Sequence, residues 1–195
     1  MVTPLRSVGT HAAENLQYIR QTMERSSSFT AVPGVGGVVM GVIGLAAAGI
    51  GARQPTGDRW LAIWLVAAAI AAVVGLVFMS LKARAAGLTL MGTNTRRFAL
   101  GMAAPFVAGA AITYELWAVN NFTVMAPTWL LLYGAGLLTG GMFSVRVVRI
   151  IGVCFMAVGL AAVLTPHEWG NIWLAIGFGG CQIAFGIYIA RNHGG

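Results

Sequence analysis

The hydrophobic positions of the chain fall into six long, unbroken runs separated by short polar segments. Each run is about 18 to 22 residues long, and a helix needs about 20 apolar residues to cross a hydrocarbon core of about 30 Å. The runs do not alternate between apolar and polar residues and are too long for barrel strands, so they predict helices. The predicted transmembrane helices are residues 32–51, 60–81, 98–119, 124–143, 147–164 and 169–190.

The composition agrees with this pattern. The 195 residues are 58% hydrophobic and 9% charged, with a mean hydropathy of +0.81, whereas a soluble domain carries about 25% charged residues. We therefore predict an all-α integral membrane protein with a bundle of six transmembrane helices. The predicted organisation is an N-terminal segment at 1–30, a transmembrane domain at 31–190 and a short tail at 191–195.

The basic residues indicate the orientation. Ten of the twelve Lys and Arg residues lie in the N-terminal segment, the second and fourth connections, the start of the fifth predicted helix and the tail, all on one predicted side. Only Arg53 and Arg59 lie on the other side. Lys and Arg collect in cytoplasmic segments, so both termini are predicted to be cytoplasmic, in the plasma membrane (the bacterial inner membrane). This placement also explains the net charge of +7 through contact with membrane lipids, and no nucleic-acid partner is expected.

The tryptophans fit the same orientation. All six lie in the parts of their helices nearest the predicted external side, where indole rings prefer the membrane interface. We predict an external aromatic belt made of Trp60, Trp64, Trp117, Trp129, Trp169 and Trp173.

Aromatic pairs also suggest an internal repeat. Each even-numbered predicted helix begins with two aromatic residues spaced i, i+4, and the pairs are Trp60/Trp64, Trp129/Tyr133 and Trp169/Trp173. This spacing predicts three tandem helical hairpins in parallel orientation. Chance similarity between compositionally simple membrane segments is the alternative.

Residues 10–25 have a different pattern. Ala12, Leu16, Ile19 and Met23 form one apolar stripe, and polar residues occupy the other faces. The segment predicts an amphipathic helix that lies on the cytoplasmic membrane surface or docks a partner.

Polar side chains within the predicted helices are the candidate functional positions. Glu115 is the only acid inside a run, in the outer third of its helix next to Thr113 and Tyr114. An embedded carboxylate is costly unless it is paired or hydrated, so Glu115 either serves a function or reaches the interface. Gln182 lies near the middle of the last helix, where it either links two helices by a hydrogen bond or lines a polar path.

The residues that most enzymes need are scarce. Asp58 is the only aspartate, and the three histidines lie outside the apolar runs, so no metal, cofactor or catalytic residue is expected. An enzyme acting on a lipid is the least favoured hypothesis, because only Glu115, His167 and Glu168 could serve it.

We therefore expect a non-enzymatic membrane subunit or oligomerising bundle that contacts partner proteins, further copies of itself or lipids. Pairs such as Gly37/Gly41 and Gly136/Gly140 bring small residues onto helix faces, which permits close helix packing. The alternative is a small-solute channel or transporter lined by Thr113, Tyr114, Glu115 and Gln182.

Overall fold

The helices occur where the hydrophobic runs predict them. A computed structural model of the protein describes residues 15–16, 32–85 and 92–192. The elements are α2 (Gly34–Gly51), α3 (Gly57–Ala85), α4 (Thr93–Ala118), the 3₁₀ turn η1 (Phe122–Val124), α5 (Met125–Gly141), α6 (Arg146–Val163), the 3₁₀ turn η2 (His167–Trp169), α7 (Gly170–Leu174), the π-helical segment η3 (Ala175–Cys181) and α8 (Gln182–Asn192).

Six of the helical stretches are long and apolar enough to cross a membrane, with η2, α7, η3 and α8 together forming the sixth. The prediction of an all-α bundle with six transmembrane helices is confirmed, and the chain is a multi-pass membrane protein. The predicted amphipathic helix at 10–25 lies outside the described residues, except for Asn15 and Leu16, which are helical and exposed.

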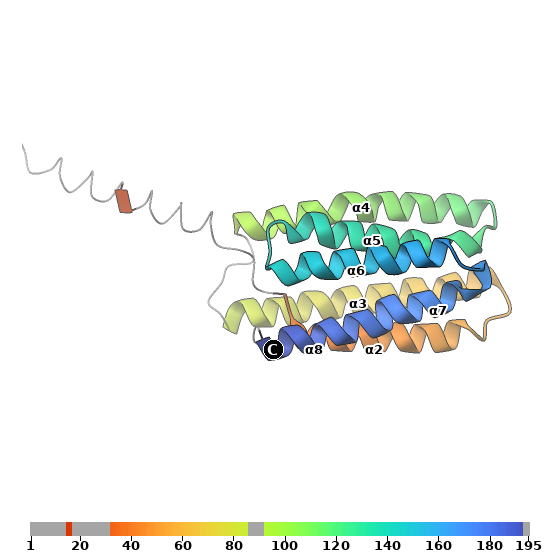
Figure 1. Cartoon of the computed structure of the whole chain (residues 1–195), viewed down its shortest axis with the longest axis horizontal. Helices are drawn as coiled ribbons and strands as arrows, with labels where there is room; N and C mark the ends of the chain where they lie inside the picture. The colour runs from red at the N-terminus through yellow and green to blue at the C-terminus, as the bar shows by residue number, and fades with distance from the viewer. Residues whose placement is uncertain (1–14, 17–31, 86–91, 193–195) are drawn as a thin grey trace, which may run out of the picture.

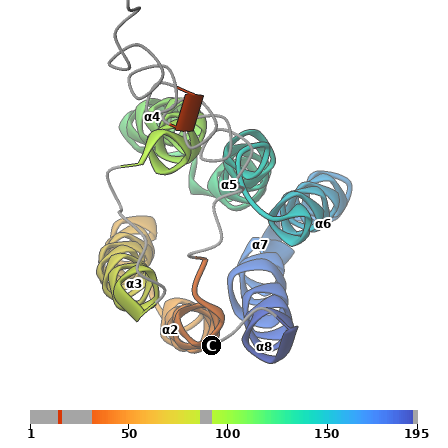
Figure 2. The ribbon, with the colours of Figure 1, turned by 90° about the vertical axis from the view of Figure 1, so that its left-hand side faces the viewer.

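The helices lie side by side, and chain neighbours run in opposite directions (Figure 1). Seen from one end, they follow one another around the bundle in chain order, and α8 returns to pack against α2 (Figure 2). Packing is close between α2 and α3, between α4 and α5, between α5 and α6, and between α8 and α2. In contrast, α3 and α4 scarcely approach each other along their length. The three successive helix pairs are present, and their origin in a sequence repeat stays a prediction.

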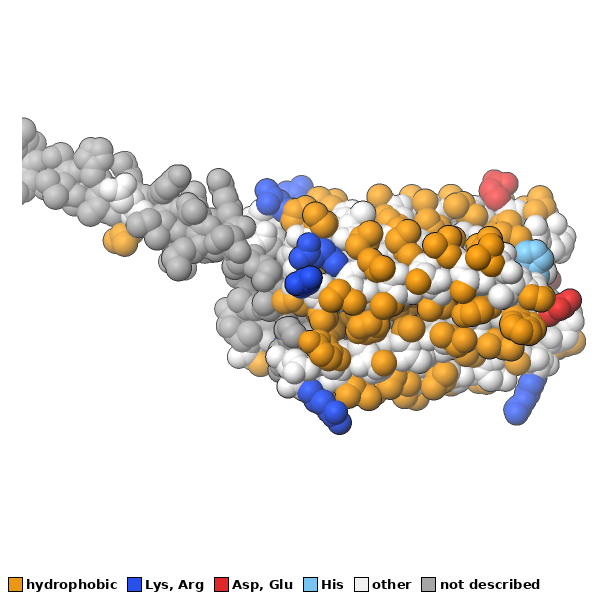
Figure 3. All heavy atoms as spheres, viewed as in Figure 1, with side chains coloured by type: hydrophobic (Ala, Val, Ile, Leu, Met, Phe, Trp, Pro, Cys, Tyr) orange, Lys and Arg blue, Asp and Glu red, His pale blue; other side chains and the backbone are white. Residues whose placement is uncertain are grey.

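The two ends of the bundle carry different side chains. One end, here called the arginine end, holds Lys82, Arg84, Arg96, Arg97, Arg146, Arg149 and Arg191. The opposite end, here called the tryptophan end, holds the six tryptophans together with Asp58, Glu115, Glu168 and His167. Arg53 and Arg59 also lie at the tryptophan end. Figure 3 shows most of the visible basic side chains at the arginine end, the acidic ones at the tryptophan end, and apolar side chains covering the flank between the ends. That the arginine end faces the cytoplasm stays a prediction.

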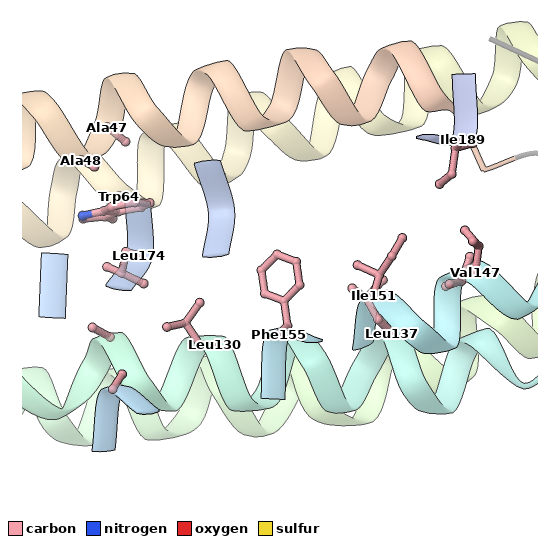
Figure 4. Close-up of a cluster of buried hydrophobic side chains, with 13 residues drawn as sticks. Ala47, Ala48, Trp64, Leu130, Leu137, Val147, Ile151, Phe155, Leu174 and Ile189 are labelled. Atoms are coloured by element: carbon pink, nitrogen blue, oxygen red, sulfur yellow. The ribbon is translucent and has the colours of Figure 1, made fainter. Parts of the chain in front are cut away.

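Large apolar side chains fill the interior between the two halves of the bundle. Leu130, Phe155 and Leu174 are completely buried there. Figure 4 shows them in a row that continues from Trp64 to Ile189 along the bundle.

Glycines set the closest helix contacts, and the seam between α2 and the sixth span (η3 and α8) shows this most clearly. A Cβ atom on Gly41 would lie 2.9 Å from the carbonyl oxygen of Gly179, and one on Gly186 would lie 2.6 Å from the amide nitrogen of Val38. A Cβ atom on Gly44 would overlap the Phe178 carbonyl. Because these neighbours are backbone atoms, they cannot move aside as a flexible side chain can.

Glycines also allow close backbone contact at two further seams. Between α5 and α6, a Cβ atom on Gly152 would lie 2.7 Å from the amide nitrogen of Leu138. Between α4 and α5, a Cβ atom on Gly101 would lie 2.8 Å from the Cα atom of Gly140. Helices in lipid associate by close packing, so these glycines explain which helices adjoin.

We predict that Gly44→Ala destabilises the bundle by about 1–3 kcal/mol, the usual cost of overpacking. Gly49→Ala is the matched control on the same helix, because a Cβ atom there meets nothing within 4 Å. Thermal unfolding in mild detergent should show a lower midpoint for Gly44→Ala only. Equal midpoints for the two variants would contradict the role given to the glycine seam.

Candidate functional site at the tryptophan end

One amide side chain joins three helices at the tryptophan end. Asn171 lies in α7, and its Oδ1 atom accepts hydrogen bonds from the indole nitrogens of Trp60 at 3.1 Å and Trp64 at 3.2 Å. Its Nδ2 atom donates to the carbonyl oxygen of Ala48 in α2 at 2.7 Å. Asn171 therefore fixes the sixth span against α2 and α3 with both ends of its amide.

The aromatic rings above this amide extend the network to α4 and α5. The Trp60 ring stacks on Trp129 of α5, with centroids 5.4 Å apart and planes 7° apart. The Trp129 indole donates to the Thr113 hydroxyl of α4 at 2.8 Å, and this hydroxyl donates to the carbonyl of Gly109 at 2.6 Å. A continuous polar and aromatic chain thus crosses the bundle from α7 to α4.

A second aromatic cluster lies deeper in the bundle. The Tyr133 ring contacts Phe155 and Phe178 with centroids 4.7 and 5.1 Å apart. Gln182 donates from Nε2 to the Tyr133 hydroxyl at 3.3 Å, which links α8 to α5. Gln182 therefore has a helix-linking contact, which is one of the two roles expected for it.

A pocket opens above Asn171, where the three connections of the tryptophan end meet. Its volume is about 260 Å³. The lining residues come from all three connections and the helix starts that follow them, and they include Gln54, Thr56, Trp60, Thr123, His167, Glu168 and Asn171. Trp60 and Asn171 line the pocket and belong to the network, so a molecule in the pocket would touch the residues that hold the helices together.

The four candidate polar positions do not share one surface. Thr113 faces Trp129 in the interior, and Gln182 faces Tyr133. Tyr114 is exposed and lies beside the Trp117 ring. Glu115 is also exposed and is absent from the pocket lining. The structure therefore brings none of the four together, and a function for any of them stays a prediction.

Most of the tryptophans make contacts inside the protein. Besides the three already described, Trp117 donates to the Asp58 carboxylate at 2.9 Å and Trp173 donates to the Thr165 hydroxyl at 2.7 Å. Trp169 is exposed. Gathering at one end is compatible with an aromatic belt at the membrane surface, which itself stays a prediction.

Sequence reasoning missed Asn171. The available signal was an amide between Trp169 and Trp173 at the start of a predicted helix, a place where a polar residue normally meets water. Its partners lie more than one hundred residues away in the chain, so no local pattern identifies them.

Acid and base side chains are dispersed within the part of the chain that the structure describes. His167 and Glu168 line the pocket, and Glu115 lies on α4. Among the described residues, no three His, Cys, Asp or Glu side chains gather where they could hold a metal ion. Cys154 and Cys181 are both free and partly buried.

Comparisons with protein-family models, curated proteins and solved structures gave no match to this chain.

We predict that Asn171→Ala lowers the free energy of unfolding by about 1–3 kcal/mol, because it leaves the indole N–H groups of Trp60 and Trp64 without their acceptor and removes the bond to the Ala48 carbonyl. Asn192→Ala is the control, since that side chain makes one exposed bond to the Tyr188 carbonyl. Thermal unfolding, together with tryptophan fluorescence of the folded state, measures the effect. If Asn171→Ala unfolds at the same temperature as Asn192→Ala, the three-helix link is not structural.

Proposed function

We propose that the protein is a non-enzymatic membrane subunit that binds a second membrane-embedded chain along α4. The observation that carries this proposal is the exposure of α4: none of its 26 residues is buried within the bundle. In comparison, α5 buries nine of its 17 residues. Among the long helices, α4 is thus the one whose packing is least complete within a single chain.

The side chains on the outward face of α4 support a protein partner. Ala104, Ala108, Ala111 and Glu115 are all exposed and are spaced i, i+4, i+7 and i+11, which places them on one face. This face lies on the far side from Met102, which packs towards α5. Small residues permit close approach of a second helix, and an embedded carboxylate is stabilised by a partner.

The outward face of α3 provides an internal comparison. Val66, Ile70, Val73 and Val77 have the same spacing and are exposed, but they are large and aliphatic. Such residues suit contact with lipid tails. Alanines offer little surface to lipid, and they allow the backbone of another helix to come close. Helix α4 also exposes Leu100 and Val107, so the support comes from its strip of three alanines with Glu115 and not from the composition of the whole helix.

The filled interior favours a subunit over the small-solute channel. Leu130, Phe155 and Leu174 are completely buried where a central path would run, and Tyr133 and Phe178 pack against Phe155. A path through the bundle would require these side chains to move apart.

We expect Ala108→Leu to weaken association by about tenfold or more, since overpacking an interface costs about 1–3 kcal/mol. Ala62→Leu is the matched control, an exposed alanine on α3. Native mass spectrometry after gentle extraction from the native membrane should show a complex for the unaltered protein and for Ala62→Leu, and mostly single chains for Ala108→Leu. A single chain in every sample, or an undiminished complex with Ala108→Leu, would refute the proposed interface.

A further inference from the structure

The charges around the pocket above Asn171 favour a cation as its ligand. Among the described residues, those that line the pocket include the Glu168 carboxylate and the His167 imidazole but no Lys or Arg. Arg53 and Arg59 flank the lining stretch 54–57 in the chain, and neither of them lines the pocket. A positively charged ligand therefore meets a carboxylate in the pocket itself.

The hydrogen-bonding atoms of the lining point to a ligand that donates. Gln54 donates from Nε2 to a backbone carbonyl of α2 at 3.0 Å, and the Thr123 hydroxyl donates to the Asn121 side chain at 2.8 Å. These donors are thus engaged within the protein, whereas Gln54 Oε1, the Thr123 oxygen and the Glu168 carboxylate keep lone pairs that can accept. A primary ammonium group, which offers N–H donors and no acceptor, matches this set.

Two aromatic rings form the apolar part of the lining, and other residues hold both of them in place. The Phe122 ring lies against Gly57, where a Cβ atom would overlap it. The Trp60 ring stacks on Trp129, and its indole nitrogen donates to Asn171. Aromatic faces attract cations and bury the apolar body of a ligand. Because both rings are already positioned, binding costs little further ordering.

The volume of the pocket sets the size of the ligand. It is about 260 Å³, slightly below the range of about 300–1,000 Å³ that is typical of sites for drug-sized molecules. It equals the volume of about nine water molecules at about 30 Å³ each. A compact molecule of about seven non-hydrogen atoms therefore fits.

We propose that the pocket at the tryptophan end binds a small amine in its ammonium form, with the charged nitrogen at the Glu168 carboxylate and the apolar body against Trp60 and Phe122. The pocket is separate from the alanine face of α4, so the site does not depend on the proposed partner chain. Since Trp60 and Asn171 also join the helices, binding stabilises the folded protein.

The test is binding of cyclohexylammonium, which has the expected size, to the purified full chain in mild detergent. Cyclohexanol is the matched probe of the same size without the charge. Isothermal titration calorimetry should show saturable binding of the amine with an affinity about tenfold higher than that of the alcohol, the effect of one charge-assisted hydrogen bond. The amine should also raise the midpoint of thermal unfolding. Equal affinity for the two probes, or no saturable binding of the amine, would overturn the proposal.

A second amine separates a pocket from a simple ion pair at the protein surface. Methylammonium carries the same charge but lacks the apolar body, so it should bind at least about tenfold more weakly than cyclohexylammonium. Equal affinity for the two amines would mean that the aromatic wall takes no part, which would also refute the site.

A pair of carboxylate variants locates the charged nitrogen. Glu168→Gln should lower the affinity for cyclohexylammonium by about tenfold, to near that for cyclohexanol. Glu115→Gln is the control and should leave the affinity unchanged, because Glu115 is exposed at the same end and absent from the pocket lining. The proposal fails if Glu168→Gln binds the amine as tightly as the unaltered protein, or if both variants lose it equally. The comparison of the two amines uses the unaltered protein, so it decides the question even if Glu168→Gln fails to fold.

Discussion

The close approach of helix backbones at glycines is the constraint on which the rest of this structure depends. In a bilayer, apolar side chains gain little by leaving lipid, so helices are held by dense packing and a few hydrogen bonds. Gly41, Gly44 and Gly186 bring α2 to backbone contact with η3 and α8, and Gly152 brings α5 to backbone contact with α6. The seam between the first and last spans closes the ring in which the helices follow one another in chain order. At the tryptophan end, the Asn171 amide fixes the position of the sixth span relative to α2 and α3 through its hydrogen bonds.

The same constraint explains where the bundle is open. The glycines of α3 and α4 do not face one another. Among the described residues, α3 and α4 contact each other near their ends, through Trp117 with Asp58 and through Ala83 with Phe98. As a result α4 keeps two unoccupied surfaces. Its outward alanine face suits a second helix, and its side towards α3 is only partly covered. A protein in which α4 buries no residue and α3 buries only three of 29 is suited to assembly within a membrane.

The sequence predicted the spans well because each span depends on a local property, namely the length of an apolar run. The first predicted helix ends at Gly51, as does α2, and the fifth differs from α6 by one residue at each end. The sequence could not predict which helices adjoin, since Gly41 and Gly179 meet through the fold and not through any local pattern. For the same reason it grouped Thr113 with Glu115, two residues that a helix directs to different faces. Asn171 escaped notice because all its partners are distant in the chain.

The central claim is that α3 packs on one side only. The most direct measurement is a nitroxide scan of residues 65–77 in reconstituted bilayers, reading the accessibility of each label to oxygen dissolved in the lipid. The account predicts one minimum per helical turn, on the side that faces α2 near Ala71 and Gly75, and high accessibility at positions 65, 72 and 76. A second minimum at positions 65, 72 and 76, as deep as the first, would show that α3 and α4 are packed together along their length and would contradict the account.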